Sequence, residues 1–135
     1  MAPSFPSDHW RQCAAVLGAS GVAAGAFGAH ALKQTLLSRG STDSWRTAVT
    51  YQLVHALAIL SLGIREPNSN CTVPYNATCN LWLVGTVLFS GSIYALSVGA
   101  GERFKLIGPV TPLGGLLMIG GWALLATGSE SPRRN

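Results

Sequence analysis

Long apolar blocks separated by short polar segments dominate the hydrophobic pattern of this chain. Four blocks, at about residues 13–31, 47–64, 81–100 and 106–127, contain no charged residue. A soluble amphipathic helix repeats its apolar positions with a period of about 3.6 residues, whereas the third block is apolar nearly all round. A hydrocarbon core of about 30 Å needs about 20 apolar residues per helical crossing. The pattern therefore predicts an all-α membrane protein, a four-helix transmembrane bundle with short loops.

The blocks also divide the chain into one domain and two tails. Residues 1–12 form an N-terminal tail, residues 13–127 the four-helix domain and residues 128–135 a C-terminal tail. A cleaved secretory signal is the alternative for the first block, because Ala29, His30 and Ala31 form an A-x-A pattern after an apolar run. A single arginine before the block and the length of the run favour a retained helix.

The basic residues indicate topology rather than a nucleic-acid partner. The formal net charge is +4, but the nine Lys and Arg are scattered over loops and tails without a basic stripe. Five of them fall in the first and third loops, against four on the opposite side, and positive charge favours the cytoplasmic or matrix side. The pairs Trp10–Arg11 and Trp45–Arg46 are typical of interfacial collars.

Glycines recur along the first block at spacings of three, four and three. At about 100° per residue they share one helix face roughly 80° wide. Without a hydrophobic force between helices in lipid, close backbone approach through small residues is a main attraction. The spacing predicts a packing face for a helix of this chain or of a second copy, although glycine and alanine could also be merely tolerated there. The residues are Gly18, Gly21, Gly25 and Gly28.

Polar side chains gather beneath one membrane face of the predicted bundle. His30 ends the first crossing, Tyr51, Gln52 and His55 lie on one face of the second, and Tyr94 is near the exit of the third. Intramembrane ionisable groups are functional candidates by default. The cluster could instead provide only interhelical hydrogen bonds. Both interpretations stay open from the sequence.

The loop from Arg65 to Asn80 carries two further candidate features. Cys71 and Cys79 are close enough in the chain to form a disulfide in an oxidising compartment, or they remain reduced thiols. Asn70 and Asn76 begin formal N-glycosylation sequons. Because the loop is short, either asparagine would lie close to the bilayer, so use of both sequons is not expected.

No residue pattern for catalysis is present in the sequence. The two candidate histidines lack a carboxylate or thiolate partner at their depth, and neither a Ser-His-Asp set nor a phosphate loop occurs. We therefore expect no enzyme, no metal and no cofactor. The leading hypothesis is a non-catalytic accessory or scaffold protein that packs with membrane subunits, a second copy or lipid. The alternative is a site for a quinone, a lipid headgroup or a proton-coupled solute, lined by the His, Tyr and Gln cluster.

Four ordered motifs resemble a known family. They are GAFGAHALK from Gly25, WRTAVTYQLVHALAIL from Trp45, LFSGSIYAL from Leu88 and TPLGGLLMIGGWALLA from Thr111. Together they are similar to the small membrane proteins that include eukaryotic transmembrane protein 256 and bacterial inner-membrane relatives. The resemblance implies a four-helix multi-pass protein with a retained first helix and no established activity. It leaves the endomembranes, the plasma membrane and the mitochondrial inner membrane as candidate locations.

Overall fold

The chain folds into helices. The computed structural model describes residues 6–64, 74–99 and 107–128, and within these ranges the structure contains helices and turns but no strand. This confirms the all-helical class. The helices are α1 (Pro6–Ala29), α2 (Lys33–Ser38), α3 (Thr42–Gly63), α4 (Tyr75–Ser97) and α5 (Ile107–Thr127).

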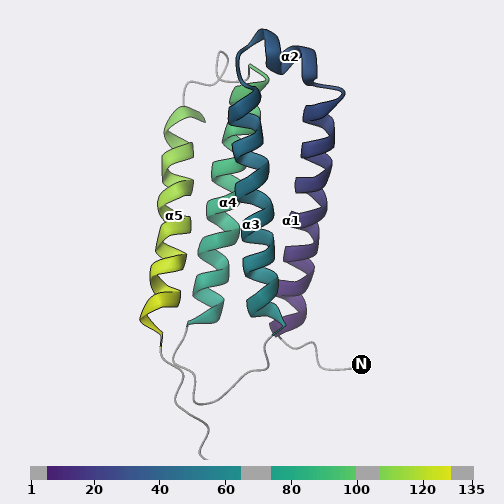
Figure 1. The fold of residues 1–135 in the computed structure, drawn as a ribbon. Helices are drawn as coiled ribbons and strands as arrows, with labels where there is room; N and C mark the ends of the chain where they lie inside the picture. The colour runs from purple at the N-terminus through teal and green to yellow at the C-terminus, as the bar shows by residue number, and fades with distance from the viewer. Residues whose placement is uncertain (1–5, 65–73, 100–106, 129–135) are drawn as a thin grey trace, which may run out of the picture.

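The four long helices form a row rather than a closed bundle (Figure 1). α1 packs on α3, α3 on α4 and α4 on α5, whereas α1 and α5 are not among the extensively packed pairs of the described residues. The two outer helices therefore carry exposed apolar side chains, such as Val16 and Phe27 on α1 and Leu116 and Ile119 on α5.

The short helix α2 lies across one end of the row (Figure 1). Its Leu36 is buried and anchors it there. Gly40 has a φ of 62°, a left-handed conformation that favours glycine, and so reverses the chain before α3. The hydroxyl of Ser41 then donates to the carbonyl of Ser97 at 3.0 Å, which ties the start of α3 to the end of α4.

Length and apolar composition qualify three of the described helices to cross a membrane. These are the segments Asp8–Ala29, Tyr75–Ser97 and Ile107–Thr127. α3 has a similar length but contains more polar residues, so the fourth crossing stays a prediction.

Three helices, α1, α3 and α4, begin earlier than the apolar blocks predict, and α3 starts at Thr42 rather than at residue 47. α1 starts at Pro6, where proline suits the first helical turn, and Arg11 pairs with Asp8 at 3.0 Å. α4 starts at Tyr75, so Thr78 and Cys79, expected in the loop, are buried inside the helix. Polar residues lower the hydropathy of these first turns, although Trp10 in α1 and Thr78 and Cys79 in α4 are buried in the protein.

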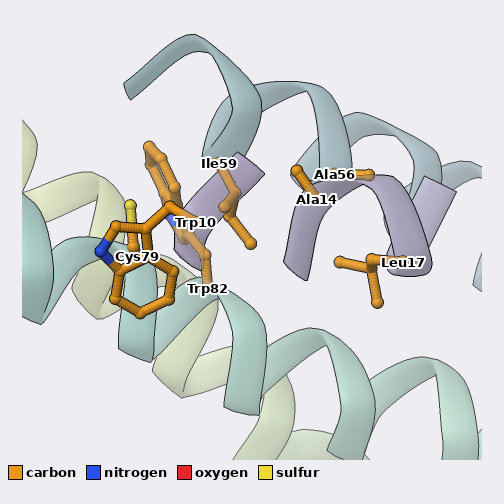
Figure 2. Close-up of a cluster of buried hydrophobic side chains, with 7 residues drawn as sticks. All are labelled: Trp10, Ala14, Leu17, Ala56, Ile59, Cys79 and Trp82. Carbon is orange, nitrogen blue, oxygen red and sulfur yellow. The ribbon is translucent and has the colours of Figure 1, made fainter. Parts of the chain in front are cut away.

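The main cluster of buried hydrophobic side chains lies at the end of the row opposite α2, where α1, α3 and α4 meet (Figure 2). Its buried members are Trp10, Ala14, Leu17, Ala56, Ile59, Cys79 and Trp82.

The tryptophans of the predicted collars pack inside the protein. Trp10 is buried in the cluster, and its indole nitrogen donates to Asn76 Oδ1 at 2.8 Å. Trp45 is buried as well, and its indole nitrogen donates to the carbonyl of Ala24 at 2.9 Å. Both rings therefore join helices of the protein, and their position at the membrane interface stays a prediction.

The closest helix contact joins α4 to α5 through glycines that the spacing argument did not single out. A Cβ built on Gly114 would lie 2.5 Å from the backbone nitrogen of Phe89 and 2.7 Å from the carbonyl oxygen of Gly85. Only hydrogen fits in this space, so the two backbones touch directly. Dispersion contacts of this kind hold helices together in lipid.

We expect Gly114→Ala to destabilise the fold by about 1–3 kcal/mol, because overpacking must move one backbone away from the other. Gly91 on α4 is the matched control, since a Cβ there would meet nothing within 4 Å. Gly91→Ala should be neutral or stabilising by up to about 1 kcal/mol. The measurement is the free energy of unfolding of both variants in detergent micelles. Equal effects would contradict the α4–α5 contact.

Candidate functional site

The glycine face of α1 packs against α3 and sets how the two helices align. Ordered along α3, the pairs are Gly28 with Trp45, Gly25 with Val49, Gly21 with Leu53 and Gly18 with Ala56. A side chain at Gly28 would overlap the Trp45 indole, and one at Gly21 would lie 2.9 Å from Leu53. The glycines therefore serve a contact within the chain.

This alignment separates His30 from the other predicted site residues. His30 follows the end of α1 and lies two residues beyond Gly28, at the level of the first turn of α3. Tyr51 is two turns further along α3, or about 12 Å at 1.5 Å per residue. The His30 side chain is exposed. The structure thus brings four of the five residues near one another and leaves His30 apart.

Gln52 is the centre of a hydrogen-bond network that joins three helices. Its side-chain nitrogen donates to the carbonyl of Leu17 at 2.9 Å and to the hydroxyl of Ser20 at 2.8 Å, both on α1. Its side-chain oxygen accepts from the hydroxyl of Tyr94 on α4 at 2.8 Å. Gln52 is only 6% exposed. Every hydrogen bond that this amide makes therefore holds α3 between its two neighbours.

His55 joins α3 to α5. Its Nδ1 lies 2.8 Å from the carbonyl oxygen of Tyr51, and its Nε2 lies 3.2 Å from the indole nitrogen of Trp122. A carbonyl only accepts and an indole N–H only donates, so Nδ1 carries the proton and Nε2 accepts. These partners hold the imidazole as the neutral Nδ1–H tautomer, with both nitrogens occupied.

Aromatic rings surround this histidine. The ring of Tyr51 stacks on His55 at a centroid distance of 6.2 Å, and Trp82 and Trp122 approach it edge-on at 6.2 and 6.1 Å. Tyr51 also packs on Phe89 at 5.0 Å. Unlike His55, Tyr51 is 45% exposed. The imidazole is thus enclosed by rings from α3, α4 and α5.

Several partners in these networks escaped the sequence argument. Trp122 and Ser20 bond to the predicted residues, and Ser90 donates to the carbonyl of Ala48 at 2.8 Å. The sequence shows polar residues in each apolar block, but only the alignment of the helices shows which of them form hydrogen bonds with one another. Two buried polar atoms of the described residues have no partner, Thr78 Oγ1 and Trp82 Nε1.

The cysteine and sequon features are not supported by the structure. Cys79 is a free thiol buried in α4, and Cys71 lies outside the described residues. Asn70 also lies outside them. Asn76 is in the first turn of α4, where its side-chain oxygen accepts from Trp10. Around Asn76 and Cys79 the structure has a helix where the sequence predicted a loop. Neither a disulfide nor glycosylation therefore finds support.

Two cavities follow the α1–α3 seam, and no residue of the predicted polar cluster lines either. The first, of about 510 Å³, lies near α2, and the second, of about 400 Å³, lies between the middle parts of α1 and α3. Within the described residues, no three His, Cys, Asp or Glu side chains gather as a metal site would require.

Comparison with known proteins gives family relationships without an activity. Residues 24–115 match the family described as "Protein of unknown function (DUF423)". The E. coli K12 "UPF0382 inner membrane protein YgdD" is 41% identical over 123 residues, which cover 90% of this chain and 88% of that protein. No solved structure gives a significant match.

Relatives also come from Gram-positive bacteria and yeast. "UPF0382 membrane protein SSP2132" of Staphylococcus saprophyticus is 38% identical over 110 residues, covering 80% of this chain and 85% of that protein. "UPF0382 membrane protein C1782.12c" of Schizosaccharomyces pombe is 37% identical over 117 residues, covering 83% and 93%.

We predict that Gln52 and Tyr94 are energetically coupled. In a double-mutant cycle of Gln52→Leu and Tyr94→Phe, unfolding free energies in micelles should give a coupling of about 0.6 and at most about 1.7 kcal/mol, the range of interhelical hydrogen bonds in membranes. Tyr51→Phe is the control, because the Tyr51 hydroxyl makes no hydrogen bond among the residues that the structure describes, and its effect should be within about 0.5 kcal/mol. A coupling of zero would contradict the network.

Proposed function

Because this chain belongs to the DUF423 (UPF0382) family of membrane proteins, we propose that it is a non-catalytic, four-pass accessory or scaffold protein that packs with other membrane subunits or lipid. The observation that carries the proposal is that the residues of its polar cluster are engaged in hydrogen bonds within the protein, whereas Thr78 Oγ1 and Trp82 Nε1 are the buried polar atoms of the described residues without a partner. Gln52, His55 and Ser90 bond to other helices or to backbone, and Ser92 bonds to Thr111 at 2.6 Å. Side chains engaged in this way hold helices together, and a substrate would have to compete with these bonds.

Two features support α3 as the fourth crossing. It packs between α1 and α4, which both qualify as membrane spans, and it has nearly their length. Its polar groups are also satisfied internally. Thr47 and Thr50 donate to the carbonyls of Asp43 and Arg46 one turn back, at 2.9 and 3.0 Å. Satisfied polar groups cost little in lipid, so a hydropathy average understates how well α3 tolerates the bilayer.

The outer helices support the accessory role. On α5, Leu113, Leu116 and Ile119 are more than half exposed, and Val16 and Phe27 on α1 are similarly exposed. α1 and α5 are the two outer helices of the row (Figure 1), so lipid or another protein can cover these side chains. A membrane subunit could add a helix at either edge without disturbing the interior.

The alternative, a small-molecule site formed by His30, Tyr51, Gln52, His55 and Tyr94, has weaker support. His30 lies apart from the others, and the hydrogen bonds of Gln52 and His55 are already made within the protein. A ligand would have to replace these bonds before it could use the same atoms.

Cysteine labelling tests the fourth crossing. In a background with the three native cysteines changed to alanine, Ser38→Cys places a single thiol at the end of α2, shortly before α3 begins, and Ile64→Cys places one directly after α3 ends. If α3 crosses the bilayer, a membrane-impermeant maleimide added to sealed vesicles should label only one of them. The other should react only after permeabilisation.

Ala48→Cys is the control for labelling, because Ala48 is fully buried and should stay unlabelled in both conditions. Labelling of Ser38→Cys and Ile64→Cys from the same side would refute the fourth crossing.

Photo-crosslinking in native membranes tests the accessory role. A benzoylphenylalanine at the exposed position Leu116 should give a discrete adduct of higher mass with a partner subunit or a second copy. The same group at Met118, which is buried on the opposite side of α5, should give none. If Leu116 and Phe27 both yield only monomer, and the purified protein is monomeric in mild detergent, the accessory role loses its basis.

A further inference from the structure

The seam between α1 and α3 is polar at one end and apolar along the rest. The cavity near α2, here the outer cavity, is lined by residues of α1, α2 and α3. The second cavity, here the inner cavity, continues along the same faces of α1 and α3, one turn after another. On α3 the stripe consists of Arg46, Thr50, Leu53, Leu57 and Leu60. One elongated molecule could therefore contact both cavities.

Two cations stand at the outer cavity. Lys33, the first residue of α2, forms no ion pair within the part of the chain that the structure describes. Arg46 is 76% exposed at its side chain, and its contact with Asp43 is long, at 3.7 Å. Thr42 and Thr50 add hydroxyl groups to the lining. Lys33 and Arg46 therefore bring two positive charges to the cavity, and the carboxylate of Asp43 pairs only loosely with one of them. The cavity is positively charged and suits an anion.

The start of α3 adds to this positive field. The hydroxyl of Ser41, at the N-cap position, makes no capping bond and donates instead to Ser97 on α4. The N–H groups of the first turn, beginning at Thr42, therefore have no side-chain cap. Free N–H groups and the helix dipole both favour an anion at such an end.

The inner cavity has no comparable polar group. Only alanine, glycine, valine and leucine line it. Val22 and Leu57 on its walls are 63% and 66% exposed, so the groove opens sideways toward lipid. From Arg46 to Leu60 the stripe is about 21 Å long at 1.5 Å per residue, which exceeds the depth of one leaflet in a hydrocarbon core of about 30 Å.

We propose that this seam binds one anionic phospholipid. Lys33, Arg46 and the N-terminus of α3 hold its phosphate, and one acyl chain lies in the apolar groove between α1 and α3. The site is separate from the internal polar network. It rests on the proposed membrane placement of α3, which the cysteine labelling tests separately, so a failure of that placement and a failure of the lipid site can be told apart.

Spin-label electron paramagnetic resonance tests the headgroup contact. The full chain is reconstituted in phosphatidylcholine vesicles with spin-labelled phosphatidylglycerol or spin-labelled phosphatidylcholine. The wild type should prefer phosphatidylglycerol by about fivefold for each cation that contacts the anionic lipid, or by up to about 30-fold for the two. The double variant Lys33→Gln and Arg46→Gln should lower the ratio to near one.

Arg11→Gln is the matched control for charge, because Arg11 lies at the other end of α1 and pairs with Asp8. It should keep the preference. A wild type without preference, or an equal loss in Arg11→Gln, would overturn the site and leave only a general attraction between charges. Circular dichroism checks that each variant keeps its helix content, which is expected because the cations are exposed.

Filling the groove tests the acyl chain and distinguishes a lipid from a free phosphate. Ala15→Leu narrows the inner cavity and should also bring the ratio near one, whereas Ala23→Leu, on an exposed face of α1 outside both cavities, should not. Excess glycerol 3-phosphate should leave the lipid bound. Release of the lipid by glycerol 3-phosphate, or no effect of Ala15→Leu, would overturn the phospholipid assignment in favour of a phosphate site.

Discussion

The fold depends on satisfying polar groups inside the protein, because lipid provides no hydrogen-bond partners for them. Gln52 shows this most clearly, since its amide reaches α1 through Leu17 and Ser20 and reaches α4 through Tyr94. His55 does the same toward α5 through Trp122. The polar residues that make α3 the least hydropathic long helix are therefore the ones that connect it to all three of its neighbours.

Close packing of small residues sets the geometry in which these bonds form. The α1 glycines allow Trp45 and Leu53 to lie directly on the α1 backbone, and Gly85 and Gly114 bring α4 and α5 into contact. In lipid such contacts replace the hydrophobic driving force that joins helices in water. The same close approach leaves grooves beside the seam, with basic residues only at the end near α2.

Some of the candidate site could be read from the sequence, and some could not. Gln52, His55 and Tyr94 are polar residues within apolar blocks, and such residues face protein because lipid excludes them. Their partners were not readable, because Trp122 is distant in sequence and looks like an interfacial residue. His30, like His55, is a histidine within an apolar block, so the sequence gives both the same prediction. The alignment of α1 with α3 leaves His30 exposed and outside the hydrogen-bond network.

The sequence by itself determined the helical class, the approximate helix positions and the glycine face, because each depends on residues near one another in the chain. It misjudged the helix starts at Pro6 and Tyr75, because the first turns of α1 and α4 contain polar residues that a search for apolar blocks leaves out. Only the tertiary structure decided the open row of helices, the neutral tautomer of His55 and the cavity beside Lys33 and Arg46. Each of these depends on how far one helix is shifted along another, and that shift is the sum of many weak contacts between residues distant in sequence.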